Sequence, residues 1–299
     1  MTPSRRQFLH TSAAAAAALA GATAVPAAQV SQKAKRAAPR LRKAIKFDMI
    51  RVDGSVEKKF ELIKSLGFEG VEINSPGGVN RDEALAAKKK TGVEIHGTID
   101  SVHWEQRLSD PDPAVRAKGL AALKTAIDDC AFYGGTTVLL VPGRVSNPQT
   151  ENFQQCWERS QAEVKKVLPQ AEKAGVKIAI ETVWNDFITK PDQLVKYVDE
   201  LNSPAAAAYF DISNMIKYGV APADWVRALG KRLAKFDFKG YSHKNQWVDI
   251  GEGDENWPEV LKALGEIGYN GWATSEVRGG GPAELKEISR RMDKVLGLA

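Results

Sequence analysis

The chain has 299 residues, 43% of them hydrophobic and 26% charged, which is the composition of an ordinary soluble globular protein. Its two cysteines, Cys130 and Cys156, are too few for a disulfide framework and too far apart for a redox or metal-binding motif. The formal net charge is +5, but residues 1–40 contain six Lys or Arg and no acid, which leaves −1 for the other 259 residues. A body so close to neutral lacks the attraction to phosphate backbones that nucleic-acid binders need, so we expect no nucleic-acid partner.

The N-terminus has the three parts of an export signal. Ser4-Arg-Arg-Gln-Phe-Leu9 is a twin-arginine pattern, residues 13–25 form a weakly hydrophobic alanine-rich run, and Pro26-Ala-Ala28 offers small residues for cleavage. The apolar run is too short and too mild to span a membrane, so we expect no stable membrane insertion after cleavage. We predict a twin-arginine signal peptide over residues 1–28, a basic linker over residues 29–40, and a periplasmic or otherwise exported protein. An alanine-rich tail without signal function is the alternative.

From residue 41 on, strand-like apolar runs alternate with amphipathic helical stretches. Ser55 and Gly67, for example, are typical start and stop signals around the first predicted helix. The predicted strands cover residues 44–49, 69–73, 93–97, 136–141, 176–181, 206–211, 233–239 and 271–276. Eight strand–helix units of this size are typical of a (β/α)8 TIM barrel, the α/β fold that we predict for residues 41–299. A doubly wound open sheet is the alternative.

Four successive predicted strands end in an acidic residue. These residues are Glu181, Asp211, Asp237 and Glu276. In a barrel, the C-terminal ends of the strands meet at one rim, which is where TIM-barrel enzymes carry their active sites. A carboxylate at a buried strand end is unfavourable unless it is paired, and a divalent cation is a good partner. The four acids therefore predict an oxygen-rich metal site, with helix N-caps and ion pairs to neighbouring Lys or Arg as the alternatives.

The same rim is expected to receive histidine and tryptophan side chains. His96 ends the third predicted strand, His103 follows in the next loop, and His243 lies in the loop after the seventh strand. Their clustering favours substrate contact, although a single loop histidine is more often solvated and a loop tryptophan often covers the core. The residues predicted to bind substrate are His96, His103, Trp104, Trp184, Lys239 and His243.

The strand-end segments resemble the sugar phosphate isomerase/epimerase superfamily, the xylose-isomerase-like TIM barrels, over residues 41–299. The segments that carry the resemblance are Ile180-Glu-Thr-Val-Trp-Asn-Asp-Phe187, Tyr209-Phe-Asp-Ile-Ser-Asn214, Gly230-Lys-Arg-Leu-Ala-Lys-Phe-Asp-Phe-Lys239, Gly251-Glu-Gly253 with Trp257, and Gly268-Tyr-Asn-Gly-Trp-Ala-Thr-Ser-Glu276. The resemblance implies one divalent metal held by Glu, Asp, His and Glu from strands five to eight. It also implies that two glutamates, here Glu181 and Glu276, flank the substrate and exchange a proton with it.

The sequence departs from this pattern at the seventh strand. The family usually has His-Val-Lys-Asp there, whereas this chain has Asp237-Phe-Lys-Gly240, so Asp237 takes the place of the histidine ligand. We expect Asp237 to ligate the metal in its stead, with His243 as the alternative fourth ligand. A ligand set made only of carboxylates favours Mn²⁺ or Mg²⁺, with Co²⁺ and Zn²⁺ as the less suited ions.

The resemblance implies a metal-dependent sugar isomerase or epimerase that abstracts a proton next to a carbonyl group. Export favours a free or oxidised sugar over a phosphorylated one. The alternatives are a 3-keto-glycoside lyase or hydrolase with the same metal site and a non-catalytic sugar-binding barrel. A DNA-repair endonuclease of the superfamily would need more histidines and a basic face. Relatives are often dimers or tetramers, and the sequence leaves a homo-oligomer open.

Overall fold

The computed structural model describes residues 39–298 of the chain. The predicted signal peptide and nearly all of the predicted linker therefore lie outside the described residues. No helix within the described range combines the length and the apolar character that crossing a bilayer requires.

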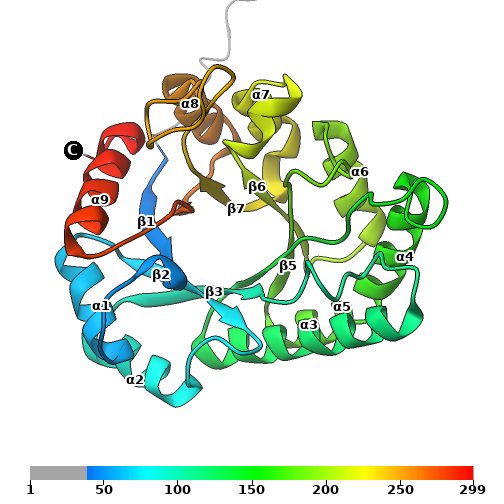
Figure 1. The fold of residues 1–299 in the computed structure, drawn as a ribbon, viewed down its shortest axis with the longest axis horizontal. Helices are drawn as coiled ribbons and strands as arrows, with labels where there is room; N and C mark the ends of the chain where they lie inside the picture. Colours follow the sequence, from blue (N-terminus) through cyan, green and yellow to red (C-terminus); the bar gives the residue numbers. More distant parts are fainter. Residues whose placement is uncertain (1–38, 299) are drawn as a thin grey trace, which may run out of the picture. The chain divides into compact units, whose positions relative to one another are not determined.

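Eight parallel strands of this range close into a barrel in the order β1-β10-β7-β6-β5-β4-β3-β2 (Figure 1). The strands are β1 Leu41–Lys46, β2 Gly70–Ser75, β3 Glu94–Asp100, β4 Thr137–Leu140, β5 Lys177–Glu181, β6 Ala206–Asp211, β7 Leu233–Phe238 and β10 Gly271–Ser275. The first strand closes the barrel because it pairs with β2 on one side and with β10 on the other. The predicted (β/α)8 TIM barrel is confirmed, and the open sheet is excluded because an open sheet has two edge strands.

The helices surround the barrel (Figure 1). They are α1 Val56–Ser65, α2 Arg81–Thr91, α3 Pro113–Tyr133, α4 Phe153–Lys165, α5 Leu168–Ala174, α6 Pro191–Leu201, α7 Pro222–Leu229, α8 Trp257–Ile267 and α9 Pro282–Leu296. Three short 3₁₀ turns lie between them at Phe47–Met49, Asn214–Tyr218 and Gly230–Arg232. A two-stranded antiparallel hairpin, β8 (Tyr241–Ser242) and β9 (Gln246–Trp247), follows β7. This hairpin is the one antiparallel ladder among the strands named here.

Local sequence signals mark the helix ends, as predicted for Ser55. The Ser55 hydroxyl accepts a hydrogen bond from the backbone N–H of Lys58 at 3.3 Å, which caps the start of α1. Gly134 ends α3 with a φ of +71°, a conformation that residues with a Cβ rarely adopt. Pro282 is the first residue of α9, where its missing N–H leaves no helical hydrogen bond unmade. These signals keep each helix between two strands, so all barrel strands run in the same direction.

The main hydrophobic core lies between the barrel and its helices, where the outer faces of the strands pack against apolar helix faces. The interior of the barrel contains a much smaller apolar cluster, made of Leu139, Ala179, Ala207 and Tyr209. Branched apolar side chains fill the interior of most TIM barrels. The small size of this cluster means that other kinds of side chain must fill the rest of the interior here.

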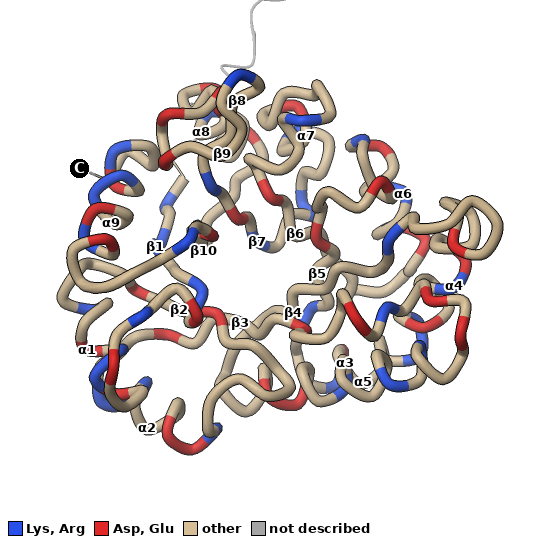
Figure 2. Tube along the Cα trace, viewed as in Figure 1, with Lys and Arg blue, Asp and Glu red and all other residues tan. Residues whose placement is uncertain are grey.

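Charged side chains fill that space. Glu72, Lys235 and Asp237 are each at most 1% exposed, on β2 and β7. Figure 2 shows acidic and basic positions along the barrel strands as well as on the outer helices. Burying a charge is costly unless it is paired and hydrogen-bonded, so these residues must form a network with one another. That network supports the residues at the C-terminal rim described below.

Candidate active site

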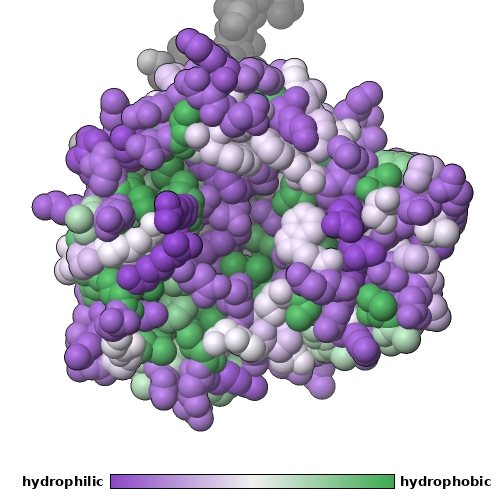
Figure 3. Space-filling view, viewed as in Figure 1, coloured by the Kyte–Doolittle hydropathy of each residue, from purple (hydrophilic) through white to green (hydrophobic). Residues whose placement is uncertain are grey.

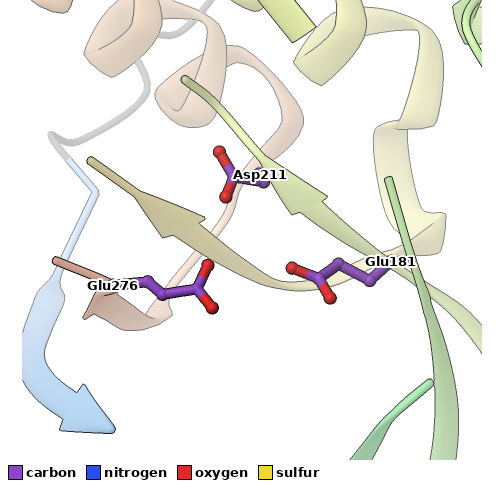
Figure 4. A group of neighbouring side chains, drawn as sticks. All are labelled: Glu181, Asp211 and Glu276. Atoms are coloured by element: carbon purple, nitrogen blue, oxygen red, sulfur yellow. The ribbon is translucent and has the colours of Figure 1, made fainter. Parts of the chain in front are cut away.

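Three of the four predicted metal ligands meet at the C-terminal rim of the barrel. Glu181 ends β5, Asp211 ends β6, and Glu276 follows the last residue of β10, and Figure 4 shows their carboxylates turned toward a common space. One oxygen atom of each lies within 4.8 Å of the others. Glu181 and Asp211 are 5% and 0% exposed, whereas the side chain of Glu276 is 33% exposed. Three carboxylates so close together require positive charge nearby.

Lys239 supplies part of that charge. Its ammonium group contacts both Asp211 and Glu276. The other oxygen of Asp211 accepts hydrogen bonds from the backbone N–H groups of Ser213 at 2.9 Å and Asn214 at 2.8 Å. Burial alone would lower the pKa of Lys239, but the carboxylates of Asp211 and Glu276 raise it above its ordinary value. Lys239 is therefore a fixed cation between two of the three acids.

The structure does not bring Asp237 into the three-acid group. Its Oδ1 accepts a hydrogen bond from the Tyr209 hydroxyl at 2.5 Å, and its Oδ2 pairs with Lys46 Nζ at 2.7 Å. Lys46 also reaches Glu276 at 2.9 Å. Burial raises the pKa of Asp237 to about 7, although Lys46 acts in the opposite direction. An aspartate side chain is shorter than histidine, so its carboxylate stays near its strand, where these partners hold it.

His96 lies away from the rim, which corrects the prediction that it ends its strand and contacts substrate. The third strand continues to Asp100, and the β2–β3 register shifts next to His96. The imidazole stacks on Trp272 at 4.4 Å between ring centroids, and Lys235 Nζ lies 2.6 Å from its Nδ1. His96 is 3% exposed and does not line the cavity described next. Its role in the structure is to fill the N-terminal half of the barrel interior.

A cavity of about 550 Å³ is lined by two of the three acids, Glu181 and Glu276. We call it the active-site cavity. Four of the residues predicted to bind substrate line it: His103, Trp104, Trp184 and Lys239. His243 does not, because it lies exposed at the β8–β9 hairpin, where its backbone N–H bonds to Asp254 at 2.8 Å. In the space-filling view, hydrophilic residues surround a hollow near the middle of the visible face (Figure 3).

Several cavity residues were not predicted from the sequence. They are Lys46, Asp48, Arg51, Glu72, Asn74, Asn214, Trp247 and Arg278. A sequence signal exists for three of them. Glu72 and Asn74 alternate with apolar residues in β2, which places both on the inner face of the strand. Lys46 ends β1 just as the acids end their strands, and the same rule applied to basic residues would have found it. Loop residues such as Arg278 carry no comparable signal.

The two glutamates have opposite protonation preferences. Burial raises the pKa of Glu181 well above its usual range, and the Lys46 ammonium offsets this only in part. Burial alone would also raise the pKa of Glu276, but Lys46 and Lys239 lower it well below its usual range. The pKa of Glu181 is thus raised and that of Glu276 lowered at the same cavity. Such a separation is typical of an acid and a base that act on one substrate.

Comparisons with known proteins agree with this architecture. L-ribulose-5-phosphate 3-epimerase UlaE of Salmonella typhi is 26% identical over 228 residues, which cover 72% of this chain and 79% of that protein. Among solved structures, a D-tagatose 3-epimerase-like protein aligns with a TM-score of 0.74 at 20% identity, covering 86% of this chain and 98% of that one. The 3-keto-D-glucoside 4-epimerase YcjR from E. coli aligns with a TM-score of 0.73 at 16% identity, covering 86% and 99%.

The family described as "Xylose isomerase-like TIM barrel" matches residues 60–295. This match spans well over half of the chain and includes β2 through β10 and nearly all of α9. The three acids and Lys239 all fall within it. The chain therefore belongs to the xylose isomerase-like TIM barrel family.

Proposed function

We propose that the protein is a sugar epimerase or isomerase that moves a proton on a carbon next to a carbonyl group. The observation that carries this proposal is the pair Glu181 and Glu276, close together at one cavity with pKa values displaced in opposite directions. The epimerase names of the relatives support the same reaction class. A binding protein would need the cavity but would not need an acid and a base.

We assign each of the cavity side chains a separate role in the reaction. The Glu276 carboxylate accepts the proton from the substrate carbon, and Glu181 supplies a proton to the same carbon. Between these two transfers, negative charge develops on the substrate oxygen, and the ammonium groups of Lys46 and Lys239 beside Glu276 stabilise it. Trp104 and Trp184, which line the cavity, offer apolar surfaces to the C–H face of the sugar.

The three-acid group also suits a divalent ion. Its donors are all carboxylate oxygens, which favour Mn²⁺ or Mg²⁺ over Zn²⁺. We propose Glu181, Asp211 and Glu276 as the main ligands, and the Lys239 ammonium would have to leave its present contacts with two of them. Asp237 would join as a fourth ligand only by releasing Lys46 and Tyr209. When bound, such an ion would polarise the substrate carbonyl and an adjacent hydroxyl.

Metal binding is expected to depend far more on Asp211 than on Asp237. Calorimetric titration of Mn²⁺ into metal-stripped protein should give one site, and Asp211→Asn should weaken it by more than about 100-fold because a direct ligand is lost. Asp237→Asn should weaken Mn²⁺ binding by about tenfold or less, because the Asp237 carboxylate pairs with Lys46 and accepts a hydrogen bond from Tyr209. The opposite ranking of the two variants, with both folded by circular dichroism, would make Asp237 the principal ligand.

We also propose that residues 1–28 direct export by the twin-arginine route, on the strength of Arg5 and Arg6 before an alanine-rich run. Replacing both arginines with lysine should leave the protein in the cytoplasm, whereas replacing Lys33 and Lys35 with arginine should not alter export. Fractionation of cells that express each variant measures the result. Periplasmic recovery of the double variant at the level of the unchanged protein would contradict the proposal.

Solvent hydrogen exchange tests the proposed function most directly. The protein is incubated in D₂O with Mn²⁺ and either D-allulose, D-tagatose or a methyl 3-keto-glucoside, and NMR follows the hydrogens next to the carbonyl. We expect deuterium to enter one of these positions, together with formation of the epimer. Absence of exchange with every substrate, despite measurable sugar binding, would favour the non-catalytic sugar-binding barrel.

A further inference from the structure

A second cavity of about 830 Å³ lies beside the active-site cavity. We call it the side cavity; the segment after β7, the segment after β10 and the first turns of α9 line it. The residues that line both cavities are Lys239, Trp247, Glu276, Val277 and Arg278. Because Glu276 and Lys239 belong to both walls, the side cavity opens directly from the proposed reacting groups. A ligand seated on Glu276 can therefore extend into it.

The side cavity differs chemically from the active-site cavity. Its lining includes Val248, Ile250, Ala283 and Ile288, none of which lines the active-site cavity. Its lining has three basic residues and four acidic ones, so its formal net charge is close to zero. Arg291 pairs with Asp249 at 3.0 Å, with Glu252 at 2.8 Å and with Glu287 at 2.9 Å. An apolar centre with a neutralised rim suits an uncharged ring better than a phosphate or a carboxylate.

Trp247 stands where the two cavities meet. Trp247 is 47% exposed, one of the largest exposures of a large hydrophobic residue in the described range. It is held in place by stacking on Trp184, with ring centroids 4.8 Å apart and planes 24° apart. A fixed, exposed indole is a surface on which the apolar face of a sugar or an aromatic ring packs. Arg278, whose guanidinium has no carboxylate partner within residues 39–298, offers hydrogen-bond donors at the same junction.

We infer that the side cavity is a subsite for the second ring of a two-ring substrate. The sugar that reacts at Glu181 and Glu276 then arrives as the keto-bearing ring of a glycoside, and its glycosidic partner, either another sugar or an aromatic aglycone, occupies the side cavity. The shared chemistry is an uncharged ring with one apolar face. This inference rests on the proposed function for the reacting ring, but the binding of the second ring can be measured without turnover.

Ala283→Trp is the variant that tests the subsite. Ala283 lines the side cavity but not the active-site cavity, and it is exposed. An indole at this position therefore blocks the side cavity without disturbing the core. Lys286→Trp is the matched control, because Lys286 is exposed on the same helix and lines neither cavity. Calorimetry compares methyl glucoside, a glucose disaccharide and 4-nitrophenyl glucoside as ligands. The disaccharide and the nitrophenyl compound distinguish a sugar from an aromatic aglycone.

We expect at least one two-ring ligand to bind about tenfold more tightly than methyl glucoside to the unchanged protein and to Lys286→Trp. Ala283→Trp should lose that advantage and keep its affinity for methyl glucoside. Equal affinities for one-ring and two-ring ligands, or an advantage that survives in Ala283→Trp, overturn the subsite. Hydrogen exchange into methyl 3-keto-glucoside reports separately on the proposed function, because this substrate leaves the side cavity empty. The two measurements can thus disprove the subsite without disproving the reaction, or disprove the reaction without disproving the subsite.

Discussion

Replacing Glu276 with glutamine is expected to lower hydrogen exchange into the sugar substrate by about 10²–10⁴-fold, the range over which a positioned general base acts. The amide has nearly the size of the carboxylate but cannot accept the proton. Lys46 and Lys239 keep their other carboxylate partners, Asp237 and Asp211, so the barrel should remain folded. The rate of deuterium incorporation from D₂O at saturating sugar and Mn²⁺ measures the effect.

Glu61→Gln serves as the matched control for this variant. The control makes the same chemical change at an exposed position of α1 that lines neither cavity. The Glu61→Gln variant should exchange hydrogen into the sugar as fast as the unchanged protein. Circular dichroism and a Mn²⁺ titration on Glu276→Gln separate a lost base from a lost ligand. Nearly full exchange in Glu276→Gln, with the metal bound, would remove Glu276 from the proposed role of base.

The rim acids were predictable because they depend on local sequence and on one topological rule. A run of apolar residues that ends in an acid identifies a strand end, and parallel strands of a closed barrel bring such ends to one rim. Glu181, Asp211 and Glu276 follow this rule in the structure. The helix caps at Ser55 and Gly134 are local as well, which is why the strand and helix order follows from sequence.

The interior network was not predictable by the same means. Lys46 and Asp237 are almost 200 residues apart in the sequence. They meet only because β1 closes the barrel by pairing with β10. A lone Glu72 or Lys235 inside an apolar strand gives no indication of which partner neutralises it. His96 was misplaced because the irregular β2–β3 register and the three further residues of β3 leave no mark in the hydrophobic pattern. Long-range pairing therefore limits what sequence reasoning can place.

Lys46→Met is expected to lower the free energy of unfolding by about 3–5 kcal/mol, the range measured when one partner of a buried ion pair is removed. The side chains of Lys46 and Asp237 are 11% and 0% exposed, so water cannot replace the lost ammonium. Glu276 loses one of its two cations at the same time. Urea-induced unfolding, followed by circular dichroism, measures the change.

The pH dependence of this loss identifies its cause. Burial already raises the pKa of Asp237 to about 7 in the presence of Lys46, and without Lys46 the pKa must rise further. The folded variant then binds more protons than the unfolded chain, so its stability falls as pH rises. Glu276 contributes to the loss at both pH values, because its lowered pKa stabilises the folded protein above the unfolded pKa of about 4 and this stabilisation shrinks without Lys46. The pH dependence between about 5 and 8 comes from Asp237. The loss should therefore be larger at about pH 8 than at about pH 5.

Lys43→Met is the control, because Lys43 is also a buried lysine of β1. Its partner Asp293 has a side chain that is 33% exposed, so water can solvate the carboxylate after the substitution. We expect a smaller loss of stability in Lys43→Met than in Lys46→Met, because the partner carboxylate of Lys43 is already partly solvated. Equal losses in the two variants at both pH values would mean that Lys46 stabilises the barrel by packing alone, and that the acids inside it are neutralised in some other way.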